Sequence, residues 1–196
     1  MKKNNFKLSF KTISKVLFVI LSGFWLVISL SFAVNCFSRV YLYPLGEKDI
    51  VLKYSNYYGL DSKIIFSIIK IESGFDRNAK SRAGAVGLMQ ITPETGDYIA
   101  ELQGVENYDL TEAKTNVKFG CFYIKYLFTR FDDIDTAICA YNAGEGNVSI
   151  WLKNQEYSED GKTLKEIPFP ETNNYIKKFH KTFAKYDKLY GKILDK

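Results

Sequence analysis

The residue best suited to acid–base chemistry is Glu72, which ends an isoleucine-rich stretch over 62–71 and precedes Ser73 and Gly74. Most acidic residues beyond residue 40 have polar neighbours, whereas this glutamate has apolar ones. Burial against apolar side chains disfavours the charged form of a carboxyl and raises its pKa, as a general acid at neutral pH requires. We therefore take Glu72 as a candidate general acid, and an incidental glutamate at a helix end is the alternative.

Two glycine-containing segments add polar groups to this candidate, GAVGLMQ over 84–90 and AYNAGEG over 140–146. Glycines allow the main chain to approach a ligand closely, while Gln90 and Asn142 offer directional hydrogen bonds. Either segment alone indicates only a tight turn or a helix cap. Together with Glu72 they predict a cleft with an acid, two amides and aromatic rings, which suits a sugar chain.

Four separated motifs occur in an order and approximate spacing that resemble the soluble lytic transglycosylase (SLT) domain family, lysozyme-like proteins acting on peptidoglycan. The motifs are Glu72-Ser73, Gly84 to Gln90, Ala140 to Gly144, and Ile167 to Tyr175. The resemblance covers roughly residues 48 to 190. One departure is Thr92, because family members often carry methionine at this position.

The resemblance implies an all-α, lysozyme-like catalytic domain over 48–196, with Glu72 as its single catalytic carboxyl. Glu72 would protonate the glycosidic oxygen between N-acetylmuramic acid and N-acetylglucosamine, and would then act as a base. The 6-hydroxyl of the muramic acid would close a 1,6-anhydro ring. Consistent with one acid, no second acid has a comparably apolar context; Glu145 and Glu171 are the nearest candidates and are predicted in loops.

Seven further residues match cleft positions of the family and are expected to bind or shape the substrate site: Ser73, Ser81, Gln90, Tyr141, Asn142, Glu171 and Tyr175. Tyr141 resembles the tyrosine whose hydroxyl lies close to the catalytic carboxyl. Gln90 and Asn142 resemble the amides that hold the cleft and the N-acetyl groups. Ser81 matches a position that can contact peptide-bearing saccharide, and Tyr175 belongs to the closing motif, where packing is the alternative role.

The elements that position these residues are predicted to be helices over 49–58, 62–73, 93–102, 115–131, 133–143 and 149–153, and a last helix that Pro168 and Pro170 precede. Asp61 and Thr92 are candidate caps for two of them. The β-branched residues of 62–73 leave a buried strand as the second interpretation. The last helix carries aromatic residues at helical spacing, which predicts a core-facing stripe: Tyr175, Phe179, Phe183, Tyr186 and Tyr190.

The net charge of +5 comes from one end of the chain. Residues 1–39 hold six basic and no acidic residues, so the remaining 157 residues hold 21 basic against 22 acidic ones. A domain that binds a phosphate backbone normally has a basic surplus of its own. Nucleic acid is therefore excluded as an expected partner.

An uncharged run of 19 apolar and small residues over 16–34 is long enough to cross a bilayer as a helix. No clean signal-peptidase site follows it, and Asn35 before Cys36 argues against lipidation. Five lysines precede the run and Arg39 follows it, which predicts a cytoplasmic N-terminus. We expect a basic cytoplasmic tail over 1–15, a single-pass membrane anchor over 16–36, a tether over 37–47 and an extracytoplasmic domain.

The remaining cysteines and the one histidine predict structural roles. Cys121 and Cys139 lie in apolar helical patterns as buried thiols, with a disulfide between them as the alternative. His180 stands among lysines and is expected on a solvated helix face. Neither a metal site nor a cofactor is expected, and the sequence identifies no protein partner in cell-wall or secretion machinery.

The best interpretation is thus a membrane-anchored peptidoglycan lytic transglycosylase. A hydrolytic muramidase of goose-lysozyme type is the first alternative, because it shares a single dominant glutamate but admits water. An inactive glycan-binding module that anchors wall to membrane is the second. The Glu72-Ser73 pair argues against that module, since binding alone requires no acid in an apolar pocket.

Overall fold

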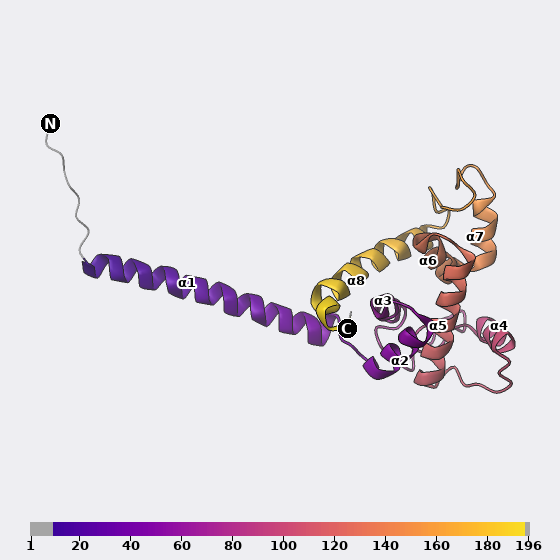
Figure 1. Ribbon diagram of the computed structural model, residues 1–196, viewed down its shortest axis with the longest axis horizontal. Coiled ribbons are helices and arrows are strands. Elements are labelled where there is room, and N and C mark those ends of the chain that lie inside the picture. The colour runs from indigo at the N-terminus through magenta and orange to yellow at the C-terminus, as the bar shows by residue number, and fades with distance from the viewer. Residues whose placement is uncertain (1–9, 195–196) are drawn as a thin grey trace. The chain divides into compact units, whose positions relative to one another are not determined.

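The computed structural model describes residues 10–194, and the chain forms two compact units, residues 1–44 and 45–196 (Figure 1). The first unit consists of helix α1, Phe10–Phe37, followed by the π-helical turn η1, Ser38–Leu42. The stretch from Phe10 to Leu42 is the one helical segment in the described residues that is long and apolar enough to cross a membrane. None of the side chains of α1 is buried in the unit. The predicted basic tail lies largely in residues 1–9, outside the described residues.

The second unit is built from seven helices connected by loops within residues 45–194. They are α2 Lys48–Tyr58, α3 Ser62–Glu72, α4 Pro93–Gln103, α5 Ala113–Arg130, α6 Ile134–Ala143, α7 Glu145–Leu152 and α8 Pro170–Leu194. Described residues contain no strand, only two isolated bridges between 80 and 91. The all-α fold class is therefore confirmed, and the strand interpretation of 62–73 is wrong. The short helix expected at 149–153 was placed too late, since α7 already begins at Glu145.

Helix α3 lies at the centre of this unit and packs along α8 (Figure 1). Its middle residues, including Phe66 and Ile68, are completely buried. The ring of Phe66 stacks on Tyr186 of α8 with 5.7 Å between centroids. The side chain of Asp61 caps the start of α3 by accepting a hydrogen bond from Lys63 N at 2.8 Å. Burial of α3 along most of its length fixes the place where its last residue, Glu72, emerges.

The loop between α3 and α4 is held in place by a buried asparagine of α5. Asn116 is fully buried; its Oδ1 accepts a hydrogen bond from Met89 N at 2.8 Å, and its Nδ2 donates to Val86 O at 2.9 Å. Gly120, one turn later, allows close packing because any added Cβ would overlap the side chain of Met89. Segment 84–91 is therefore held on α5 by hydrogen bonds between its main chain and the Asn116 side chain and by packing of Met89 against Gly120.

The positions of the cysteines and of His180 test the structural roles predicted for them. Cys121 and Cys139 are buried free thiols, so the alternative of a disulfide between them is wrong. Cys36 is free and exposed. His180 lies on an exposed face of α8, where its Nε2 is 2.9 Å from Oδ2 of Asp135.

Candidate active site

Glu72 is the last residue of α3 and opens into a cavity of about 290 Å³. The cavity is formed by the end of α3, the following loop, and parts of α4, α5, α6 and α8. Its lining residues are Glu72, Ser81, Ala83, Ala85, Gln90, Ile91, Thr92, Thr95, Tyr123, Tyr141, Asn142 and Glu171. Six of the eight site residues predicted from the sequence therefore line one cavity, and Ser73 and Tyr175 are not among its lining residues.

The carboxyl of Glu72 is half-buried and receives a hydrogen bond from a residue 103 positions away. The hydroxyl of Tyr175, on α8, donates to Glu72 Oε1 at 2.7 Å. Burial raises the pKa of Glu72 to about 7, an effect that outweighs the opposing influence of this hydrogen bond. Glu72 thus keeps its proton in a large fraction of molecules at neutral pH. Tyr175, for which packing was the alternative role, is buried and also donates this hydrogen bond to the candidate acid.

Glu171 is a second carboxyl in the same cavity, in the first turn of α8. The sequence placed Glu171 and Glu145 in loops, but both begin helices, α8 and α7. The charge of Glu171 further raises the pKa of Glu72. The first turn of a helix favours negative charge because its main-chain N–H groups are unpaired. Glu171 therefore acts on Glu72 as a nearby negative charge.

Tyr141 stands beside the carboxyl but donates its hydrogen elsewhere. Its hydroxyl donates to the main-chain oxygen of Met89 at 2.6 Å, which ties α6 to the loop before α4. Burial, with the charge of Glu72 as the next contribution, raises the pKa of Tyr141 well above its ordinary value. In the described residues the only hydrogen bond to the Glu72 side chain comes from Tyr175.

The two predicted amides differ in what they leave for a ligand. Gln90 has a left-handed main chain, φ 48°, and its Nε2 donates to Ala79 O at 3.1 Å and Gly87 O at 2.9 Å. Only its Oε1 remains to accept a hydrogen bond. Asn142 makes no side-chain hydrogen bond within the described part of the chain, so its amide can both donate and accept in the cavity.

The two predicted serines mainly stabilise the loop. The hydroxyl of Ser73 lies 2.8 Å from Leu88 O, to which it donates, and accepts a hydrogen bond from Phe75 N at 3.2 Å. Ser81 lines the cavity while its Oγ accepts from Ala85 N at 3.0 Å. Ser73 therefore joins the end of α3 to segment 84–91 without lining the cavity.

A second cavity of about 260 Å³ adjoins the first, since Thr95 and Tyr123 line both. Its walls include Tyr98 and Glu145, linked through Tyr126: the Tyr98 hydroxyl donates to that of Tyr126 at 2.9 Å. Glu145 Oε2 is buried and has no hydrogen-bond partner in the described residues. The two cavities, which share Thr95 and Tyr123, are together called the cleft below. Tyr98 and Tyr123 were not predicted as site residues, because they lie within α4 and α5 and no local motif distinguishes them from other helical residues.

No described group of three or more histidine, cysteine, aspartate or glutamate residues is arranged to hold a metal ion.

Fold and cleft define a lysozyme-like protein, and comparison with known proteins identifies its family. The family model described as "Transglycosylase SLT domain" matches residues 49–164, so the chain belongs to this family. The soluble lytic murein transglycosylase of Salmonella typhimurium is 33% identical over 141 residues, covering 69% of this chain and 22% of the relative. The membrane-bound lytic murein transglycosylase E of Buchnera aphidicola is 37% identical over 91 residues, covering 44% and 41%.

Solved structures give the same family. An inactive glutamate-to-glutamine mutant of the lytic transglycosylase Slt from Pseudomonas aeruginosa superimposes with a TM-score of 0.65 at 28% identity, covering 74% of this chain and 24% of that one. The 70-kDa soluble lytic transglycosylase in complex with bulgecin A also gives a TM-score of 0.65. The chain thus spans about a quarter or less of the length of these soluble relatives.

Proposed function

We propose that this protein is a membrane-anchored peptidoglycan lytic transglycosylase with Glu72 as its single general acid and base. The observation that carries the proposal is the half-buried Glu72 carboxyl, whose pKa of about 7 lets it both give and take a proton near neutral pH. Membership of the SLT family and the names of the relatives, which are lytic murein transglycosylases, support the choice of substrate.

The reaction divides into two proton transfers at one carboxyl. Protonated Glu72 donates to the glycosidic oxygen as the bond from that oxygen to C1 of N-acetylmuramic acid breaks. The resulting carboxylate then removes the proton of the 6-hydroxyl, whose oxygen bonds to C1 and closes the 1,6-anhydro ring. Glu72 ends protonated, and no water is consumed.

The surroundings of Glu72 suit both halves of this cycle. Burial favours the protonated form before cleavage, and the hydrogen bond from Tyr175 stabilises the carboxylate that forms during it. Asn142 and the free oxygen of Gln90 can bind the N-acetyl groups of the sugars. The inactive glutamate-to-glutamine mutant of the Pseudomonas aeruginosa relative is consistent with one essential glutamate in the family.

The apolar helix supports a single-pass anchor that keeps the catalytic domain outside the cytoplasm. Helix α1 has 28 residues, about 42 Å of helix, against roughly 30 Å of hydrocarbon in a bilayer. The lysines before residue 16 favour a cytoplasmic N-terminus by the positive-inside rule. Reporter fusions at residue 15 and at the C-terminus test this orientation; a cytoplasmic C-terminus would contradict it.

Product mass tests the reaction. The full chain in detergent is incubated with purified peptidoglycan, and released muropeptides are measured by mass spectrometry, with Glu72→Gln as the inactive control. We expect 1,6-anhydro ends, each lighter by one water than a reducing end. Reducing ends would identify a hydrolytic muramidase, and binding without cleavage by the wild-type chain would identify a glycan-binding module.

A further inference from the structure

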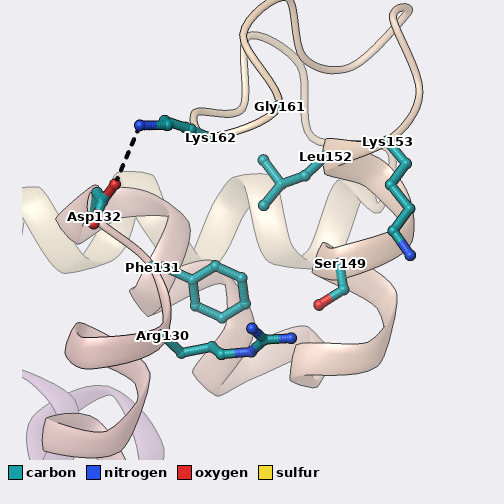
Figure 2. A pocket seen from close by; sticks show the side chains of 8 residues that line it. All are labelled: Arg130, Phe131, Asp132, Ser149, Leu152, Lys153, Gly161 and Lys162. Atoms are coloured by element: carbon teal, nitrogen blue, oxygen red, sulfur yellow. Dashed lines mark ion pairs between the residues drawn. The ribbon is translucent and has the colours of Figure 1, made fainter.

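A cavity of about 220 Å³ outside the cleft collects positive charge (Figure 2). Its rim carries Arg130 at the end of α5, Lys153 just after α7, and Lys162 from the loop before α8. Asp132 is the one acidic residue that lines it. The cavity, defined by Arg130, Phe131, Asp132, Ser149, Leu152, Lys153, Gly161 and Lys162, is called the basic pocket below.

The floor of the basic pocket is apolar. Figure 2 shows the Phe131 ring at its centre with the Leu152 side chain above it. Phe131 is only 6% exposed, so this ring is fixed by the core. The guanidinium of Arg130 points along this floor toward Ser149. A rim of cations and a hydroxyl over an apolar floor suits an anion that carries small apolar groups.

The cations of the pocket are available to a ligand. Within the described residues neither Arg130 nor Lys153 forms a side-chain hydrogen bond or ion pair, and both are exposed. Lys162 faces Asp132 at 3.7 Å, but both side chains are largely solvated, and such pairs contribute little. Cations at the ends of α5 and α7 also complement the helix dipoles. That role does not account for Lys162, which comes from a loop.

The loop presents Lys162 in a defined conformation. Asp160 Oδ1 accepts hydrogen bonds from Lys162 N and Thr163 N, both at 2.8 Å, and Gly161 N donates to Ser158 Oγ at 3.0 Å. Gly161 has a positive φ of 71°, which a side chain would strain. The turn therefore fixes the point from which the Lys162 side chain extends toward Asp132 at the edge of the pocket (Figure 2).

The basic pocket lies one helical turn beyond the cleft. Tyr126 and Glu145 approach each other at the second cavity of the cleft, with 3.4 Å between the hydroxyl and Oε1. Arg130 follows Tyr126 by four residues and Ser149 follows Glu145 by four, so each is on the same helix face about 6 Å further along. The cleft itself is lined by glutamates and no lysine or arginine. Basic side chains are therefore absent from the lining of the cleft and present in the basic pocket, one helical turn further along.

We infer that the basic pocket binds a carboxylate of the peptide stem carried by the glycan strand in the cleft. This inference rests on the proposed function, because a stem reaches the pocket only if the glycan strand that carries it lies in the cleft. A stem of four residues spans at most about 14 Å when extended, more than one helical turn. Its carboxylates would pair with Arg130 and Lys153, and its methyl groups would cover Phe131 and Leu152.

The test measures binding of a synthetic tetrapeptide stem to the full chain in detergent micelles. The probe is compared with the same peptide after all its carboxylates have been converted to amides. We expect the acid to bind about tenfold more tightly than the amide, as charge-assisted hydrogen bonds predict. In the double variant Arg130→Gln/Lys153→Gln this preference should disappear, while Lys178→Gln/Lys185→Gln, an equal change of exposed charge on α8, should retain it.

Three outcomes would overturn the inference: equal binding of acid and amide, a preference that survives in Arg130→Gln/Lys153→Gln, or pocket-dependent binding of poly(glycerol phosphate) with none of the stem. A second measurement separates this inference from the proposed function. The ratio of kcat/KM for peptide-bearing over peptide-free strands should fall in the pocket variant. If the wild-type chain cleaves neither strand, the proposed function is refuted. The peptide-binding measurement still tests whether the basic pocket binds the stem.

Discussion

Two carboxyls face the same cavity from opposite kinds of helix end. Glu72 closes α3 at its C-terminus, half-buried, and accepts a hydrogen bond from Tyr175. Glu171 stands in the first turn of α8, is exposed, and has no side-chain partner among the described residues. Burial raises the pKa of the Glu72 carboxyl, whereas Glu171 is solvated at a helix start, which favours negative charge. The same chemical group is therefore more readily protonated at Glu72, where it is buried, than in a solvated position.

Removing each carboxyl in turn is the most direct test of the difference between Glu72 and Glu171. Glu72→Gln should lower kcat about a thousandfold, because general acid–base catalysis contributes on that order. Glu171→Gln should lower it less than about tenfold, since it removes a neighbouring charge only. Release of soluble muropeptides per unit time measures both. Equal losses in the two variants would show that the carboxyls share the catalytic role.

The buried carboxyl should also cost stability above neutral pH. Because the folded-state pKa of Glu72 is raised from 4.5 to about 7, the folded chain binds more protons between these values and loses stability as pH rises through them. Glu72→Gln removes this loss, so its free energy of unfolding should exceed that of the wild type by about 3 kcal/mol at pH 8. Near pH 4 the difference should vanish. Denaturant unfolding at the two pH values measures it, and a pH-independent difference would contradict the raised pKa.

Variants of two tyrosines test which hydroxyl positions the Glu72 carboxyl. Tyr175→Phe removes the hydrogen bond that lowers the pKa of Glu72, so the alkaline midpoint of kcat/KM should move up and kcat should fall about tenfold. Tyr141→Phe is the matched control, because its hydroxyl donates to Met89 O. It should weaken the loop and leave the midpoint in place. A downward shift in Tyr175→Phe would contradict the hydrogen bond.

The smallest effect concerns the charge of Glu171. Its removal lowers the pKa of Glu72, because a like charge nearby disfavours the carboxylate. In Glu171→Gln the alkaline midpoint of kcat/KM should therefore move down, by less than the upward shift in Tyr175→Phe. Glu171→Asp, which keeps the charge, should stay near the wild-type midpoint. An unchanged midpoint in Glu171→Gln would show that this charge does not influence Glu72.

Local signals predicted much of the fold and the place of Glu72 at the end of its helix. The helix over 62–72 follows from its apolar spacing, and its cap at Asp61 follows from residue type. Thr92 likewise caps α4 as predicted, with Thr95 N donating to it at 3.2 Å. These features depend on residues within one or two turns, so the sequence pattern contains the information.

Helix boundaries near the cleft were less predictable. Glu145 and Glu171 precede or follow glycine and proline residues that indicate loops, yet α7 and α8 begin there. Proline is compatible with the first turn of a helix, and the decision between loop and helix depends on packing. The sequence therefore predicted loops for Glu145 and Glu171, although both lie in the first turn of a helix.

The sequence by itself determined the helical class, the apolar N-terminal segment and Glu72 as the carboxyl in apolar company. Only the tertiary structure decided what touches that carboxyl: Tyr175, 103 residues away, reaches it because α8 packs along α3. The same holds for Asn116, which fixes the loop beside the cleft, and for the three cations from separate segments that line one pocket with Phe131. Periodicity and caps depend on near neighbours in the chain, whereas these contacts depend on how distant helices pack.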